Sequence, residues 1–303
     1  MERGNMLIIA NPCSGKGKSK KIAPKALCAF QDAGFNATLK YTSKRGDAIN
    51  FASEMGYDIV VAIGGDGTLN ETISGVVATN NNVVVGYIPM GSTNDFARSM
   101  GIPSRWRSAV DSIISGEDKD IDVCRFNDRF FTYVAAHGIF AETSCSVSQR
   151  LKNKIGHLAY LLLGVKEVFR KNNYPVKIDV DGREIDDTYA FLGFGNTKSI
   201  GGILRFKDEY VEMSDGLFEV LLVKRPKSPW QLSRMIRRFN KSEWQGDGLE
   251  MIHAKKVKLY TKDKMLWSLD GERYIVEEDS EIENIPQAVK IRVKQNERVF
   301  KEK

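Results

Sequence analysis

The stretch that decides the fold runs from Asp58 to Glu71 and reads DIVVAIGGDGTLNE. Its apolar run, Ile59 to Ile63, is typical of a strand that is buried on both faces of a parallel sheet. Three glycines and one carboxylate, Asp66, follow directly. Backbone with few side chains therefore stands at the carboxyl end of the strand, where open α/β sheets bind their ligands.

Glycines at this position favour an anionic ligand. Without a Cβ atom their backbone approaches a ligand closely, and their N–H groups together with the start of the next helix attract phosphate. Asp66 would repel a phosphate, unless Mg²⁺ lies between them or the carboxylate accepts a proton from an attacking hydroxyl. The stretch alone also fits a simple glycine-rich turn in which Asp66 caps the helix.

Two further strand ends carry turns of this kind. NPCSGKGKS, residues 11–19, resembles a Walker loop, but Pro12 stands where that pattern requires glycine. We still expect Ser14, Gly15 and Gly17 to offer N–H groups to a phosphate, the alternative being a flexible basic turn. In residues 89–103, Gly91-Ser92-Thr93 form a loop, and Asn94 or Asp95 caps a helix. Together the three turns predict a phosphate-binding cleft.

The pattern of elements changes near residue 123. Before it, strands at 6–10, 37–42, 59–63 and 83–88 alternate with helices at 19–33, 47–55, 70–78 and 94–100, which predicts a parallel sheet. After it, turn signals at 127–128 and 181–182 separate strand-like runs, which predict an antiparallel sheet or sandwich. These runs lie within 188–196, 216–224, 253–261, 264–272 and 288–295, with helices around 154–171 and 229–241.

Composition narrows the class of protein. The chain has 303 residues and a net charge of +6, and no apolar run approaches the roughly 20 residues that span a bilayer. The four cysteines and three histidines lack metal-site spacing, so we expect free thiols in a reducing cytoplasm. No G-x-G-x-x-G stands in the first βα turn, which argues against a nicotinamide-dependent dehydrogenase.

Six motifs carry a resemblance that covers essentially the whole chain: NPCSGKG, YTSKRGDA, IGGDGTLNE, GSTNDFAR, EMSDGLFEV and SLDGE. In order and spacing they resemble the soluble diacylglycerol kinase catalytic family, which includes bacterial lipid kinases and relatives of sphingosine and ceramide kinases. G-G-D-G-T is shared with NAD kinases, whereas the N-D-F-A-R and D-G-E blocks favour the lipid-kinase branch.

The resemblance implies an N-terminal three-layer α/β domain with a parallel sheet, residues 1–123 with a return at 292–303. It also implies a C-terminal antiparallel β-sandwich domain, residues 124–291, and an active site in the cleft between the two. Asp66 and Asp95 would belong to a Mg²⁺ and water network around the phosphates of ATP. The implied ATP contacts are Asn11, Pro12, Cys13, Ser14, Gly15, Thr42, Gly65, Asp66, Gly67, Thr68, Leu69, Asn70, Glu71, Ser92 and Asp95.

In the second domain the resemblance makes Glu272 the proton acceptor, with Asp270 as its neighbour. It also implies a structural Mg²⁺ at the Asp215 carboxylate and the carbonyls of Glu212 and Leu217. The residues alone leave simpler readings open: Asp215-Gly216 as a hairpin turn, and Asp270-Gly271 as a turn with Glu272 in solvent. Thr93 replaces a glycine that is common in the family, and GNTKSIGGI, residues 195–203, departs from a glycine-rich family run.

Residues 230–244, WQLSRMIRRFNKSEW, place basic and apolar residues at helical spacing between two tryptophans. Such a helix fits an anionic membrane surface, and a solvated face over a core stripe is the alternative. No nucleic-acid reader motif is present in the sequence. We therefore expect a cytoplasmic, peripherally membrane-associated kinase that uses ATP and Mg²⁺ on a lipid alcohol such as diacylglycerol. A soluble acceptor such as NAD and a non-catalytic nucleotide-binding regulator are the alternatives, and a homo-oligomer is compatible with the sequence.

Overall fold

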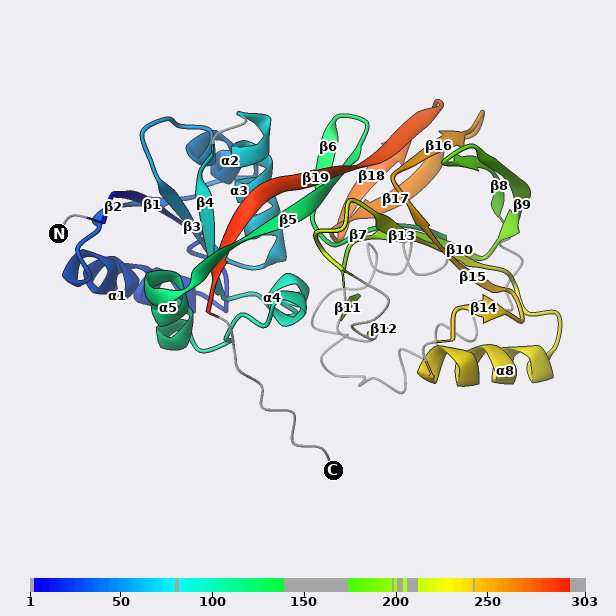
Figure 1. The fold of residues 1–303 in the computed structure, drawn as a ribbon, viewed down its shortest axis with the longest axis horizontal. Coiled ribbons are helices and arrows are strands. Elements are labelled where there is room, and N and C mark those ends of the chain that lie inside the picture. The colour runs from blue at the N-terminus through cyan, green and yellow to red at the C-terminus, as the bar shows by residue number, and fades with distance from the viewer. Residues whose placement is uncertain are drawn as a thin grey trace. The chain divides into compact units, whose positions relative to one another are not determined.

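The structure is a computed structural model that describes residues 3–79, 82–138, 174–197, 199–200, 204–205, 212–241 and 243–294. The chain forms two compact units (Figure 1). Unit one comprises residues 1–121 with 287–303, and unit two comprises residues 122–286. Within the described residues, no helix is long and apolar enough to cross a membrane.

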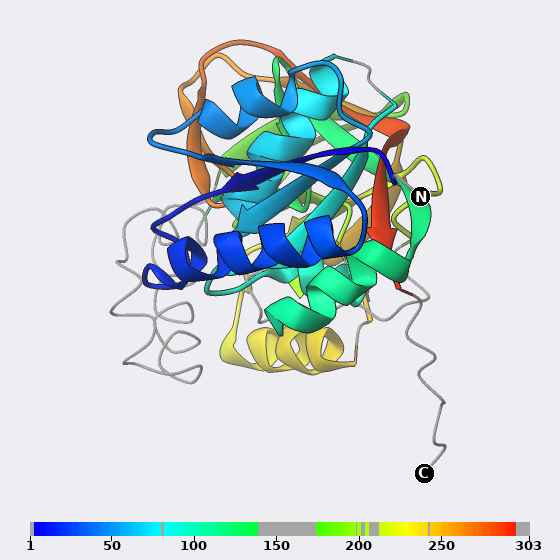
Figure 2. The same ribbon diagram turned by 90° about the vertical axis from the view of Figure 1, so that its left-hand side faces the viewer.

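Unit one is built on a parallel sheet in the order β2-β1-β3-β4-β19. The helices α1 and α5 cover one face of this sheet, and α2 and α3 cover the other (Figure 2). The predicted α/β layer structure is thus confirmed. The bounds are β1 Asn5–Ala10, α1 Lys18–Asp32, β2 Asn36–Tyr41, α2 Asp47–Ala52, β3 Ile59–Gly64, α3 Asp66–Ala78, β4 Val84–Pro89, α4 Asp95–Met100, α5 Trp106–Ser115 and β19 Ser280–Val293.

Two helices of unit one differ from the sequence prediction. The helix expected from Asn70 begins at Asp66, so Gly67 and Thr68 lie in its first turn and not in a loop. Glycine costs a helix only about 1 kcal/mol relative to alanine, and the burial of Leu69, Ile73 and Val76 stabilises α3 against this cost. The helix α5 was not predicted, although Ala109, Val110 and Ile113 form a buried stripe at helical spacing.

Unit two contains two antiparallel layers. One follows the order β14-β15-β13-β10-β7-β17-β18, and in the other β16 pairs with β8 and with the first residues of β19. Trp267, Phe194 and Phe218 lie fully buried in the core that both layers share. The predicted sandwich is therefore confirmed. The bounds are β5 Glu117–Phe126, β6 Arg129–Phe131, β7 Val134–Gly138, β8 Tyr174–Val180, β9 Arg183–Tyr189, β10 Phe191–Gly195, β13 Phe218–Val223, α8 Pro229–Asn240, β14 Gln245–Gly246, β15 Leu249–Ala254, β16 Lys256–Tyr260, β17 Met265–Leu269 and β18 Glu272–Val276, with a ribbon of β11 Ser199–Ile200 and β12 Leu204–Arg205.

The turn signals of this half were read correctly. Asn127 joins β5 to β6, and Asp181-Gly182 join β8 to β9, with positive φ at all three residues. The strands β7, β15 and β18 were not predicted as separate elements. The helix expected around 154–171 lies outside the described residues, as do residue 198 and residues 201–203 of the GNTKSIGGI run.

Candidate active site

The three glycine-bearing turns of unit one contact one another at the carboxyl ends of β1, β3 and β4. A Cβ atom built on Gly91 would lie 2.6 Å from the Cα atom of Gly65. One built on Gly15 would lie 3.0 Å from the carbonyl oxygen of Met90. The strand ends of a parallel sheet meet at one edge, and the turns come together there as the sequence predicted.

The loop 11–17 uses most of its own amides. Asn11 accepts a hydrogen bond from the Cys13 N–H on Oδ1 at 3.0 Å, and its Nδ2 donates to Thr68 Oγ1 at 3.4 Å. The N–H of Ser14 donates to the Asn11 carbonyl at 3.2 Å, and that of Gly17 to the Ser14 carbonyl at 3.1 Å. The expectation that Ser14 and Gly17 offer free N–H groups is therefore wrong. The N–H of Gly15 has no acceptor in the described part of the chain.

Asp66 is a buried carboxylate at the first residue of α3. It is 8% exposed, and it accepts hydrogen bonds from Thr93 Oγ1 at 3.1 Å and from the N–H of Phe96 at 3.3 Å. Burial raises the pKa of Asp66, and these hydrogen bonds limit the rise. Thr93, which replaces a common glycine of the family, thus holds the central carboxylate.

Asp95 adds a second buried carboxylate. It is 1% exposed, and Arg98 lies 4.0 Å away from it. Burial and the charges of Asp66 and Asp95 hold the pKa of Tyr87 well above its usual value. Two carboxylates suit Mg²⁺, which takes one or two from the protein and its other ligands from water and substrate phosphates. The described residues hold no cluster of three or more His, Cys, Asp or Glu that could bind a metal by itself.

Asn94 has a different role from the one expected. It occupies the position before α4 with a φ of 50°, and its side chain makes no capping hydrogen bond to the helix. Instead its Oδ1 accepts from the Gly91 N–H at 2.8 Å, and its Nδ2 donates to the Gly91 carbonyl at 3.1 Å. Asn94 therefore closes the loop after β4.

The remaining predicted nucleotide contacts differ in how far their side chains are buried and paired. The Leu69 side chain is fully buried in the core, so only the backbone of this residue remains for the predicted nucleotide contact. Glu71 accepts a hydrogen bond from the Gly46 N–H at 3.0 Å and thereby ties α3 to the loop that follows Thr42. The other side chains are half-buried or exposed and lie near the turns described above: Pro12, Cys13, Asn70 and Ser92.

Sequence reasoning missed Asp47, which orders the same loop. Its Oδ2 accepts from the Ser43 N–H at 2.7 Å, from Ser43 Oγ at 2.7 Å and from the Lys44 N–H at 2.9 Å. These bonds lower the pKa of Asp47. An aspartate at the start of a predicted helix, with Ser43 four residues before it, was the available signal.

In unit two, Asp270 and Gly271 form the two-residue turn between β17 and β18, with φ of 50° and 87°. Asp270 Oδ2 accepts from the N–H and Oγ1 of Thr132, at 2.7 and 2.9 Å. Its Oδ1 accepts from the N–H groups of Tyr133 and Val134, at 3.1 and 2.9 Å. Burial raises the pKa of Asp270 to about 6 despite these bonds. Asp270 thus fixes the turn, and Glu272, half-buried, opens β18.

The predicted structural Mg²⁺ ligands lie in a turn that protein groups already hold. Asp215 Oδ1 accepts from the Leu217 N–H at 3.0 Å, and the Leu217 carbonyl accepts from Asn284 Nδ2 at 3.3 Å. Asp122, which the sequence did not single out, accepts from the Gly216 N–H at 2.7 Å and from Asn284 at 2.8 Å. Glu212 is exposed. The metal at this turn stays a prediction.

The basic helix α8 is partly neutralised. Arg234 and Arg238 donate to Asp247 at 2.8 and 2.7 Å, so two of its cations have a carboxylate partner. Trp230 is 80% exposed and Ile236 37% exposed, whereas Met235 is buried. The buried Met235 fits a helix that packs an apolar stripe on the core and exposes its other face to solvent. This interpretation does not explain why Trp230 is exposed.

Comparison with known proteins decides the family. Residues 5–126 match the model of the diacylglycerol kinase catalytic domain, and residues 134–293 match that of the YegS C-terminal NAD kinase beta sandwich-like domain. The chain is 32% identical over 274 residues to the diacylglycerol kinase of Bacillus subtilis (strain 168), covering 88% of each protein. The chain belongs to the diacylglycerol kinase family.

A second relative agrees with this assignment, and a solved structure shares the fold. The diacylglycerol kinase of Staphylococcus carnosus (strain TM300) is 31% identical over 269 residues, covering 88% of this chain and 87% of that protein. A crystal structure of a diacylglycerol kinase from Bacillus anthracis str. Sterne covers 98% of each chain with a TM-score of 0.78 at 24% identity, a likeness that shows the fold. The protein is accordingly a kinase, a phosphotransferase with an alcohol acceptor.

Proposed function

We propose that this protein is an ATP-dependent lipid kinase that transfers the γ-phosphoryl group to the hydroxyl of a lipid alcohol such as diacylglycerol. The observation that carries the proposal is the buried carboxylate of Asp66 where three glycine-bearing turns meet. Phosphoryl transfer requires mainly positioning and charge neutralisation. The amides of the turns would position the phosphates, and Asp66 would hold the Mg²⁺ that neutralises their charge. The names of the curated relatives support a lipid acceptor.

In this proposal the amides at Gly15, Gly65 and Gly67 receive the phosphates of ATP, and Asn11 and Thr68 hold the two loops in register. Asp66 and Asp95 would hold Mg²⁺, which neutralises charge on the phosphates when bound. A second Mg²⁺ would stabilise the turn at Asp215. Thr42, Ser92 and Glu71 would make further contacts with ATP.

Glu272 is proposed to accept the proton of the acceptor hydroxyl, and Asp270 to hold the turn that presents it. Asp270 acts through the turn because both of its oxygens accept hydrogen bonds from residues 132–134. Glu272 and Asp66 belong to different units, so the proposal requires that both act on one bound substrate. A general base contributes typically 10²–10⁴-fold to such a reaction.

The acceptor is proposed to come from a bilayer, with α8 as one point of peripheral contact. Trp230 is the most exposed large apolar side chain of the described residues, and Lys227, Arg237 and Lys241 of the same segment are exposed cations. Tryptophan and basic residues on one surface are typical of membrane interfaces.

In the deciding experiment the protein is incubated with γ-labelled ATP and Mg²⁺ in four parallel reactions. These contain diacylglycerol, ceramide, NAD or no acceptor. We expect label in the product of a lipid alcohol. Label transferred to NAD alone would replace the lipid acceptor with a soluble one. Binding of ATP without transfer to any acceptor would leave a regulatory nucleotide-binding protein, and Asp66→Asn serves as the inactive control.

A further inference from the structure

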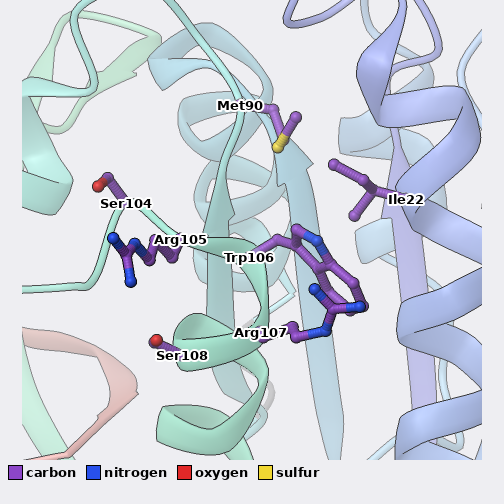
Figure 3. Close-up of a pocket in the computed structure, with 7 residues that line it drawn as sticks. All are labelled: Ile22, Met90, Ser104, Arg105, Trp106, Arg107 and Ser108. Carbon is purple, nitrogen blue, oxygen red and sulfur yellow. The ribbon is translucent and has the colours of Figure 1, made fainter.

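Unit one contains a cavity of about 450 Å³ next to the loop 11–17. None of the residues that line it is assigned to the proposed active site. It is lined by Ile22 of α1, by Met90 after β4 and by residues 104–108 at the start of α5 (Figure 3). Its volume falls in the range of roughly 300–1,000 Å³ that is usual for small-molecule sites. A phosphate group by itself would leave most of this space unfilled.

The cavity has two chemically different walls. In Figure 3, Ile22, Met90 and the indole of Trp106 lie on one side, and the Arg107 guanidinium rests against that indole at 4.7 Å from the ring centroid. Ser104, Arg105 and Ser108 point to the other side, with two hydroxyls and a guanidinium. A ligand that fills the cavity therefore needs an apolar part and a polar part.

The positive charge of the cavity lining favours an anionic group as the polar part of the ligand. No acidic residue lines it, and Arg105 and Arg107 are exposed without an ion pair in the described part of the chain. By contrast Arg98, Arg234, Arg238 and Arg292 each lie beside a carboxylate. A guanidinium matches the geometry of a phosphate with two parallel hydrogen bonds, and hydroxyls add further donors.

We propose that this cavity binds an amphiphilic phosphate monoester. Its phosphate contacts Ser104, Arg105 and Ser108, and its apolar body packs on Ile22, Met90 and Trp106. The inference goes beyond the proposed phosphoryl transfer and does not depend on which alcohol is the acceptor. The ligand has two sources, a lipid head group in a bilayer or a free phosphorylated amphiphile.

The position of the cavity decides how it must be tested. Met90 lines it and also contacts the nucleotide loop, since a Cβ atom on Gly15 would lie 3.1 Å from Met90 Cε. A phosphate probe could therefore bind at the loop instead. The titrations are made on the full chain with a saturating non-hydrolysable ATP analogue and Mg²⁺, which occupy the loop in advance.

The probes are octyl phosphate, inorganic phosphate and octanol. Isothermal titration calorimetry measures the Kd of each probe. Octyl phosphate should bind more tightly than either of the others. Arg105→Gln should raise its Kd about tenfold or more, as loss of a charge-assisted hydrogen bond does. Lys25→Gln removes the same charge from an exposed site on α1 outside the cavity, and it should leave the Kd unchanged.

The two sources are separated with vesicles of phosphatidylcholine that contain phosphatidate or lack it. Weaker sedimentation of Arg105→Gln than of Lys25→Gln with phosphatidate vesicles identifies a lipid head group. An effect on octyl phosphate alone identifies a free amphiphile. Equal octyl phosphate affinities of Arg105→Gln and Lys25→Gln, or inorganic phosphate binding as tightly as octyl phosphate, would overturn the proposal.

Discussion

Gly65 and Gly91 pack α-carbon against α-carbon, so closely that a Cβ atom on Gly91 would lie 2.6 Å from the Cα atom of Gly65 and one on Gly65 3.2 Å from that of Gly91. Real Cβ atoms essentially never lie within 3.0 Å of another atom, so the contact requires a glycine at position 91, and it leaves little room for a side chain at position 65. It brings the loop after β4 to the start of α3, where Thr93 reaches Asp66.

Gly91→Ala is expected to force these loops apart. Overpacking of this kind costs about 1–3 kcal/mol of the free energy of unfolding, so the melting temperature should fall. Gly67→Ala is the matched control, because a Cβ atom there meets nothing within 4 Å. Alanine is also the better helix former, so this variant should be as stable as the parent or slightly more. Equal melting of the two variants would show that the loops separate without cost.

Asp66→Asn is expected to reduce turnover by about 10³-fold or more, because it removes a carboxylate that would hold the charge-neutralising Mg²⁺. The fold should persist with a loss of about 1–3 kcal/mol of stability, since the amide oxygen can still accept one of the two hydrogen bonds, from Thr93 or from the Phe96 N–H. Asp58→Asn, at the opposite end of β3, changes the same group outside the site and should keep parental turnover. The measurement is initial rate with labelled ATP, and activity of Asp66→Asn within tenfold of the parent contradicts the role.

The sequence was sufficient for the parts of this site that depend on strand order. Buried runs such as Ile59–Ile63 and the helices between them imply a parallel sheet, and a parallel sheet brings its turns to one edge. What failed depended on hydrogen bonds inside a turn: the N–H groups of Ser14 and Gly17 bond within their own loop. A sequence pattern shows that an amide is present but not which acceptor it has.

Hydrogen bonds between segments far apart in the sequence could not be predicted either. Asp122 bonds to Asn284, and Asp270 bonds to Thr132, each across more than a hundred residues. Neither aspartate has a local pattern that predicts its partner. The start of α3 was missed for another reason: Gly67 was taken for part of a loop, although its cost to a helix is only about 1 kcal/mol and the packing of α3 offsets it. Leu69 was assigned to the nucleotide by its place in a motif, while its apolar side chain packs in the core.

Trp230→Ala is expected to weaken binding to vesicles that contain anionic lipid. Burying a large apolar side chain contributes about 1.5–3 kcal/mol, so the partition coefficient should fall roughly tenfold or more. Added salt should weaken the binding of the parent, because the cations of this segment, Lys227, Arg237 and Lys241, are exposed. Met55→Ala, which removes a 76% exposed side chain from unit one, is the control in the same sedimentation assay. Equal loss in both variants would remove α8 from the contact.

Glu219→Gln is expected to stabilise the protein increasingly as pH rises. Glu219 is 6% exposed on β13, and burial raises the pKa of its carboxyl to about 9 from 4.5. Between these values the folded state holds a proton that the unfolded state releases, so the parent loses stability as pH rises through this window. The loss is at most on the order of 1.4 kcal/mol per pH unit. Glutamine is neutral throughout and avoids it.

The measurement for Glu219 is thermal melting of parent and variant across the same window. The stability difference between Glu219→Gln and the parent should grow from the acid to the alkaline end. Glu184→Gln, an exposed position on β9, is the control for loss of a carboxylate in the same unit. A difference that stays constant with pH would show that Glu219 is ionised in the folded protein.

Glu272 and its neighbour Asp270 are expected to respond differently to removal of their charge. If Glu272 accepts the proton of the acceptor alcohol, Glu272→Gln should lower turnover by about 10²-fold or more, with ATP affinity and melting temperature unchanged. Asp270→Asn should behave differently, because its carboxylate accepts hydrogen bonds from Thr132, Tyr133 and Val134. An amide NH₂ cannot accept them, and each donor left unpaired in a buried place costs about 1–3 kcal/mol.

Asp270→Asn should therefore lower the melting temperature and turnover together, through displacement of the turn that carries Glu272. Both variants are compared by melting, by ATP titration and by steady-state rate with the same lipid alcohol. If ATP affinity falls in parallel with turnover in Glu272→Gln, this carboxylate contacts the nucleotide or its metal and is not the base. If Glu272→Gln melts as low as Asp270→Asn, Glu272 supports the β17–β18 hairpin, and the proton must be accepted by another group.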